Sequence, residues 1–177
     1  MILRDMGISQ KALSRICNIN QSIISRYISS NKIKSVNSSS KIQRYNIDDT
    51  RKILKNLFVK DLKIKKKIQC FYNFKGGTGK TSLCFQAATH LSLCGFKVLV
   101  VDADPQGHIS TILGFRAEDK LITLFDIIAG NINIEDAIVN LYNGLDCIPS
   151  NLSLTRIALS LDQMPNREKI IQNFFKK

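Results

Sequence analysis

Apolar residues recur at helical spacing in two stretches of the N-terminal third, 12–17 and 23–28. Between these stretches, Asn18 can take the left-handed conformation that ends a helix, and Ile19 can fill the turn. Asn20 can then cap the following helix. The pattern therefore predicts two short helices joined by a tight turn.

The residues that follow predict a short hairpin and a third helix. Residues 32–34 and 41–45 alternate between apolar and polar side chains on either side of a Ser/Asn-rich loop at 35–40. Asn46 then opens a helix that runs to about Phe58, with acidic residues in its first turn. Helix, helix, hairpin and helix together predict a small, mostly helical domain.

A different pattern begins at residue 68. Residues 68–72 predict a buried strand, and a glycine-rich loop at 73–82 leads into a helix that stops at Gly95. Residues 96–102 predict a second buried strand that ends in a carboxylate. This strand–loop–helix–strand order predicts an α/β fold with a parallel sheet, flanking helices and a right-handed crossover.

Charge separates the two parts of the chain. The 177 residues carry a net charge of +12, and the whole excess lies in residues 1–67, with 16 basic and 4 acidic side chains. Such asymmetry indicates a nucleic acid or a membrane surface as partner, or only a solvated basic face. We expect a helical domain at 1–62, a basic linker at 63–67, and an α/β domain at 68–177.

Composition narrows the class of protein. Apolar residues make up 44% of the chain, which is enough for a packed core, and no run approaches the roughly 18 apolar residues of a membrane span. The N-terminus does not resemble a secretion signal. Five cysteines at irregular spacing favour reduced thiols over a zinc site or disulfides. We therefore expect a cytoplasmic protein without a membrane partner.

The glycine-rich loop predicts a phosphate-binding site. Glycines let successive backbone N–H groups turn toward phosphate oxygens, and the positive end of the following helix adds to the attraction. Lys80 can reach the outer phosphates, and the Thr81 hydroxyl can ligate Mg²⁺. Phe74 stands where the standard G-x-x-x-x-G-K-[ST] pattern has its first glycine. The predicted ligand is ATP with Mg²⁺, bound by Lys75, Gly76, Gly77, Thr78, Gly79, Lys80, Thr81 and Ser82.

Three stretches resemble the ParA/MinD family of deviant Walker-type ATPases, and in particular its ParA branch. They are the loop at 75–81, the Asp-x-Asp-Pro-Gln-Gly stretch at 102–107, and the strand with Ile-Pro-Ser-Asn at 145–152. The resemblance implies that Lys75 reaches the ATP of a partner across a homodimer formed with ATP. It also implies that Asp102 holds Mg²⁺ through water, and that Asp104 orients the attacking water. His108 departs from the family, which usually has Asn there.

The N-terminal pattern resembles a winged helix-turn-helix of the MerR kind, and the alternative is an ordinary helical hairpin. The resemblance implies DNA contacts from the second helix and the wing, through Gln21, Ser22, Ser25, Arg26, Lys41 and Arg44. Short polar groups and a guanidinium suit base edges, whereas Lys41 and Arg44 would hold phosphates.

Together the resemblances imply a partitioning ATPase of plasmids or chromosomes that binds DNA, works with a ParB-like centromere-binding protein, associates with the nucleoid or a plasmid, and represses its own operon. The family's Walker B strand is expected at about 166–177 and is not found there, so this chain resembles the front part of a longer protein. ATP hydrolysis by the chain alone stays open. Two alternatives remain: a repressor whose site only senses ATP or ADP, and an inactive truncated fragment.

Overall fold

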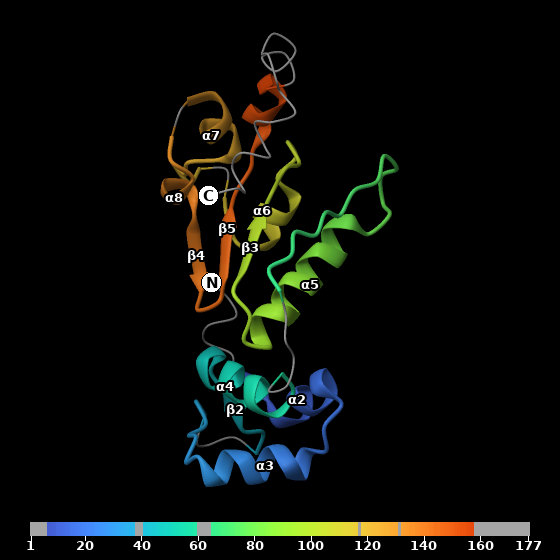
Figure 1. The fold of residues 1–177 in the computed structure, drawn as a ribbon, viewed down its shortest axis with the longest axis vertical. Helices are drawn as coiled ribbons and strands as arrows, with labels where there is room; N and C mark the ends of the chain where they lie inside the picture. The colour runs from blue at the N-terminus through green and yellow to red at the C-terminus, as the bar shows by residue number, and fades with distance from the viewer. Residues whose placement is uncertain (1–6, 38–40, 60–64, 117, 131, 158–177) are drawn as a thin grey trace. The chain divides into compact units, whose positions relative to one another are not determined.

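The computed structural model describes residues 7–37, 41–59, 65–116, 118–130 and 132–157. The chain divides into two compact units (Figure 1). The first contains the residues up to Val98 together with Tyr142–Leu145, and the second contains Leu99–Leu141 and the residues from Asp146 onward. Each unit is described by itself below.

The first unit begins with three helices and a small sheet. The helices are α2 (Gln10–Cys17), α3 (Gln21–Ser30) and α4 (Ile47–Leu57). Strands β1 (Ile8–Ser9) and β2 (Arg44–Tyr45) pair in antiparallel register, with Ile8 opposite Tyr45. The predicted order of helices in this part of the chain is confirmed.

Local side-chain hydrogen bonds separate α2 from α3. Asn18 ends α2 in the left-handed conformation, at φ 52° and ψ 39°. The Ser14 hydroxyl donates to the Ile19 carbonyl at 2.6 Å, and the Asn20 side chain accepts the Ser22 amide at 3.0 Å. These bonds satisfy backbone groups that a helix end leaves unpaired, so the predicted tight turn is confirmed.

The predicted hairpin between residues 32–34 and 41–45 is wrong. Residues 32–34 form no strand, and β2 pairs with β1 instead. The reason is Asn37, whose side chain accepts the Arg44 amide at 2.9 Å and donates to the Ile42 carbonyl at 3.0 Å. These bonds, together with the Val36 amide donating to the Arg44 carbonyl at 2.8 Å, join residues 36–37 to 42–44 without strand pairing, and residues 38–40 lie outside the described part.

One apolar core joins α2, α3 and α4 to the end of the next helix, α5 (Lys80–Leu93). Its buried members are Leu13, Cys17, Ile24, Ile28, Tyr45, Ile53, Leu54, Val59 and Cys94. Leu93 and Phe96 pack against the same cluster. The C-terminal end of α5 therefore belongs to the core of the N-terminal helices.

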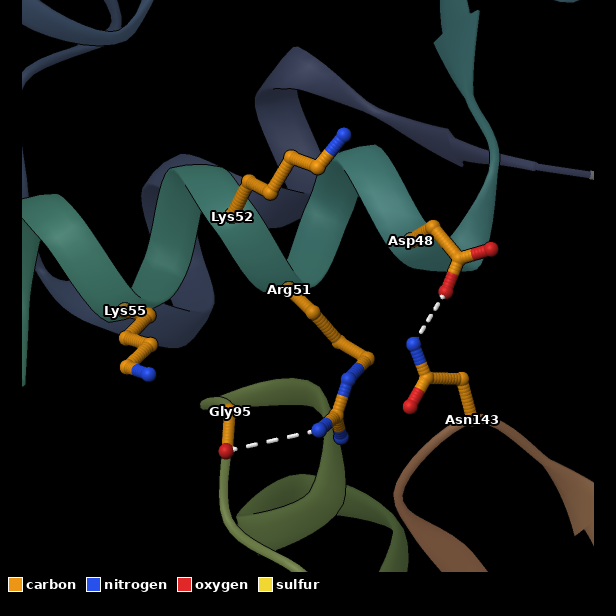
Figure 2. A pocket seen from close by; sticks show the side chains of 6 residues that line it. All are labelled: Asp48, Arg51, Lys52, Lys55, Gly95 and Asn143. Atoms are coloured by element: carbon orange, nitrogen blue, oxygen red, sulfur yellow. Dashed lines mark hydrogen bonds between the residues drawn. The ribbon is translucent and has the colours of Figure 1, made fainter.

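Polar contacts reinforce this junction (Figure 2). The Arg51 guanidinium, on α4, donates to the backbone carbonyls of Ser92, Gly95 and Phe96. Asn143 donates to the Asp48 carboxylate at 2.7 Å. Figure 2 shows Arg51 pointing from α4 toward Gly95, whereas Lys52 points away from it. The residues line a shallow pocket between α4 and the end of α5: Asp48, Arg51, Lys52, Lys55, Gly95 and Asn143.

A three-stranded sheet follows, in the order β3 (Val98–Val101), β5 (Leu145–Ile148), β4 (Val139–Tyr142). The Val98 amide donates to the Gly144 carbonyl and the Asp102 amide to the Ile148 carbonyl, so the β3 and β5 residue numbers rise together and these strands are parallel. A two-residue turn joins β4 to β5, which makes that pair antiparallel. The sheet is therefore mixed, which corrects the prediction of a parallel sheet.

Short helices accompany the sheet in the second unit. They are α6 (His108–Ile112), α7 (Leu124–Gly130), α8 (Ile134–Ala137) and the 3₁₀ turn η1 (Leu152–Leu154). Leu124, Ile127, Ala137 and Ile148 form the buried cluster there. None of the helices in the described ranges has the length and apolar character that crossing a bilayer requires.

The strand predicted at 68–72 is not formed. Residues 65–73 form neither helix nor strand, and Ile68 and Tyr72 are 69% and 70% exposed. A strand needs a neighbour for its backbone groups, and within the described residues none pairs with this segment. A β-prone composition alone is therefore insufficient here.

Candidate functional site

The glycine-rich loop lies directly before α5 in the first unit. Gly77 and Gly79 adopt positive φ angles of 70° and 81°, and Gly79 is the residue from which α5 begins. A Cβ atom added to Gly76, Gly77 or Gly79 would meet nothing within 4 Å. Space is therefore open where a side chain would project from each of these three glycines.

The Lys75 carbonyl organises the loop. It accepts the Lys80 ammonium at 3.1 Å and the Thr78 hydroxyl at 3.3 Å, while the Lys75 amide donates to the Asn73 side chain at 2.9 Å. Lys80 therefore bends back over the loop that precedes it. Its charge lies beside the loop backbone, as a phosphate ligand requires.

The start of α5 is electrostatically suited to an anion. No side chain caps it, and its first turn has no acidic residue. A 14-residue helix with uncapped amide groups carries a partial positive charge at this end. Open glycines, uncapped amides and Lys80 together fit a polyphosphate.

Asp102 follows β3 in the second unit and is 2% exposed. One carboxylate oxygen, Oδ1, accepts the Asp104 amide at 3.0 Å. The other, Oδ2, accepts the Ser110 amide at 3.1 Å and the Ser110 hydroxyl at 2.6 Å. A buried carboxylate needs such donors, and here the protein itself provides three.

Asp104 is more accessible, with 46% of its side chain exposed. Its Oδ1 accepts the Gln106 amide at 3.0 Å, and its backbone carbonyl accepts the Gly107 amide at 2.9 Å. Oδ2 lies 3.6 Å from Nδ1 of His108. Asp104 thus begins a turn and still presents one carboxylate oxygen outward.

The predicted site residues fall into both units. Residues 75–82 belong to the first, and Asp102 and Asp104 belong to the second. The half-buried Thr81 places a hydroxyl in the first turn of α5, and an oxygen donor of this kind suits Mg²⁺. The Asp102 carboxylate accepts three hydrogen bonds from the protein, so few of its lone pairs are left for another ligand.

The residues predicted to contact DNA separate into two groups. Helix α3 buries Ile24 and Ile28 and exposes a polar face made of Gln21, Ser22, Ser25 and Arg26. Lys41 is exposed, whereas Arg44 is half-buried and donates to the Gly7 carbonyl at 3.2 Å. Arg44 therefore has a structural contact that its sequence position did not reveal.

Sequence reasoning missed three residues. Ser110 and Ser150 are buried beside Asp102, and Arg51 binds the end of α5. Ser150 lies in the stretch at 145–152 that contains Ile-Pro-Ser-Asn, but the sequence does not show which hydrogen bonds a serine forms. In the sequence, Arg51 is one of 16 basic residues in the first 67 and has no further distinguishing signal.

Comparisons with known proteins identify a family for residues 65–177 and several relatives. A family model described as AAA domain (AAA_31) matches residues 65–177. The chain is 35% identical over 144 residues to the cell division protein PomZ of Myxococcus xanthus, covering 81% of this chain and 45% of PomZ. It is 41% identical over 96 residues to the chromosome partitioning protein ParA of Caulobacter vibrioides, covering 54% of this chain and 36% of ParA. The chain thus spans less than half the length of these relatives.

Two solved structures resemble part of this chain. A plasmid partition protein from Borrelia burgdorferi superposes with a TM-score of 0.55 at 29% identity, covering 64% of this chain and 50% of that one. Cobyrinic acid a,c-diamide synthase from Mycobacterium smegmatis, solved with an ATP analogue and magnesium, gives a TM-score of 0.53 at 28% identity. That match covers 59% of this chain and 43% of the synthase.

Proposed function

The chain belongs to the AAA_31 family of AAA domains, and we propose that it binds ATP with Mg²⁺ as a ParA-like partitioning ATPase. One observation carries the proposal: the open glycine loop before α5, with uncapped amides and Lys80 folded over it. Its partitioning relatives support the biological role.

In this proposal the loop amides and Lys80 bind the phosphates, and the Thr81 hydroxyl ligates the metal. When bound, Mg²⁺ neutralises phosphate charge. In the same proposal Asp104, whose side chain is 46% exposed, would orient the attacking water, and Asp102 would hold the metal through water.

The test is nucleotide affinity with and without Lys80. Lys80→Ala removes a charged contact to phosphate, so we expect the Kd for Mg-ADP to rise about 10- to 100-fold. Lys97→Ala, a change at an exposed lysine beyond α5, is the control and leaves the Kd unchanged. Calorimetry decides, and equal affinities for wild type and Lys80→Ala would refute the phosphate site.

We also propose that the N-terminal helices form a winged helix-turn-helix that binds DNA. The exposed polar face of α3 and the basic excess support this proposal. Arg26→Ala should relax sequence preference, whereas Lys41→Ala should weaken binding to all sequences alike. Each phosphate contact should add about 0.9 to the slope of log K against log salt, so binding that does not depend on salt would refute the proposal.

Lys75 is proposed to act across a homodimer. It is exposed, and its carbonyl rather than its ammonium shapes the loop. Extended to the length of its relatives, the protein should dimerise with a non-hydrolysable ATP analogue. Lys75→Ala should abolish that dimer and keep nucleotide binding. Light scattering tests this prediction, and a dimer formed by Lys75→Ala would refute it. A ParB-like partner should stimulate ATP turnover.

One observation favours a second candidate, a repressor that senses nucleotide. The core and Arg51 tie the α3 and α4 helices to the helix that follows the phosphate loop. Turnover of ATP measured with and without DNA separates the two functions. Nucleotide-dependent DNA affinity without turnover would favour the repressor.

A further inference from the structure

Three buried polar side chains meet where β3 and β5 end. Asp102 is 2% exposed, Ser110 is 3% exposed and Ser150 is 7% exposed. Burial of this degree is costly for polar groups that lack partners, so their hydrogen bonds decide what the cluster does.

Ser110 is the centre of these hydrogen bonds. Its hydroxyl donates to Asp102 Oδ2 at 2.6 Å and accepts the Ser150 amide at 3.1 Å. Its own amide donates to the same Asp102 oxygen at 3.1 Å. A single hydroxyl thus links the residue after β3, helix α6 and the segment after β5.

The link extends to Asp104. Asp102 Oδ1 accepts the Asp104 amide, so fixing the Asp102 carboxylate also fixes the backbone from which the Asp104 side chain projects. Gly107 adds a steric constraint, since a Cβ at this positive-φ residue would lie 2.8 Å from the Ser150 carbonyl oxygen. The turn at 104–107 therefore lies tightly against Ser150.

We propose that Ser110 is a positioning residue that holds Asp104 in place through Asp102. The importance of Asp104 rests on the proposed ATPase function, whereas the hydrogen-bond network does not. In this role the Asp102 carboxylate mainly accepts hydrogen bonds from the protein. The carboxylate that faces outward at this end of the sheet is that of Asp104.

The chain offers a matched control. Among the residues that the structure describes, none forms a hydrogen bond with the Ser150 hydroxyl, although the Ser150 amide takes part in the network. Ser150→Ala therefore removes a buried hydroxyl and leaves the network intact, while Ser110→Ala removes a buried hydroxyl and cuts it. Ser110→Thr retains the hydroxyl and should rescue.

The experiment is amide hydrogen exchange of the 177-residue chain, followed residue by residue by NMR. In Ser110→Ala, exchange at Asp104 and Ser150 should rise by about tenfold or more. Exchange at Ile127, whose amide donates to Thr123 in the same unit, should stay within about twofold. Ser150→Ala and Ser110→Thr should leave all of these amides near the wild-type rates.

Unchanged rates at Asp104 and Ser150 in Ser110→Ala would overturn the proposal. An equal rise at Ile127 would also overturn it, because Ser110 would then only stabilise the unit as a whole. If Ser110→Ala does not fold, Ser110→Cys, with a weaker donor of similar size, is judged by the same rates. Mg-ADP affinity measured on the same samples reports separately on the proposed function, so a chain that binds no nucleotide leaves the exchange result standing.

Discussion

Replacing Arg51 by Ala should destabilise the first unit far more than replacing an exposed residue of the same helix. The guanidinium donates to three carbonyls, those of Ser92, Gly95 and Phe96, at the end of α5. The last carbonyls of a helix have no partner within it, and a cation there also interacts favourably with the helix dipole.

The magnitude follows from these contacts. A hydrogen bond to a charged group contributes about 1.5–3 kcal/mol, and a cation at a helix C-terminus about 0.3–1 kcal/mol. Arg51 is half-buried, so water replaces part of what is lost. We expect Arg51→Ala to lower the free energy of unfolding by about 2–4 kcal/mol, and Arg51→Lys by roughly half of that because the planar fork is lost.

Urea unfolding followed by circular dichroism measures the effect. Lys52→Ala is the matched control on the same helix. The Lys52 side chain is 69% exposed, and its ion pair with Asp49, at 3.7 Å, is open to solvent. Its loss should cost less than about 0.5 kcal/mol. The reasoning fails if Arg51→Ala and Lys52→Ala unfold at the same urea concentration.

Three further outcomes are expected. Burial, together with nearby Cys94, raises the pKa of the Cys17 thiol from 9.0 to about 11, so its contribution to stability is complete below pH 9 and is lost as the pH rises toward 11. Urea midpoints across this range should fall more steeply for wild type than for Cys17→Ala. A thiol reagent should label exposed Cys70 first and the buried Cys17, Cys94 and Cys147 slowly, and equal labelling rates would contradict the burial. Asn18 has a φ of 52°, so Asn18→Ala should cost about 1 kcal/mol in thermal unfolding, whereas Asn18→Gly should be neutral or stabilising.

The features that the sequence predicted correctly depend on neighbours within a few residues. Asn18 and Asn20 separate α2 from α3 through bonds to residues close in the chain. The phosphate loop is similar, since glycine conformations and the lysine contact arise within residues 75–80. Local chemistry of this kind is visible in the order of amino acids.

The features that the sequence did not predict depend on distant partners. Strand β2 pairs with β1, more than thirty residues earlier, whereas residues 68–72 have a strand-like composition and pair with no strand in the described part of the chain. The motif predicts a metal role for Asp102, but it does not reveal that Ser110, eight residues later, supplies two of the three hydrogen bonds to its carboxylate. A hydroxyl becomes a donor to a buried carboxylate only after folding brings the two together. The pattern of hydrophobic and polar positions does not predict that contact.

The exposed segment at 68–74 has a practical consequence for handling this protein. Ile68, Tyr72 and Phe74 are 69%, 70% and 93% exposed on a backbone whose hydrogen-bonding groups face no strand within the described residues. Such segments are prone to aggregation, because two copies can pair edge to edge, and the extent of aggregation rises with protein concentration. Association through this segment would need no nucleotide and would persist in Lys75→Ala. A charged residue in place of Ile68 should suppress it, which makes Ile68→Lys the background in which dimerisation through the nucleotide is best measured.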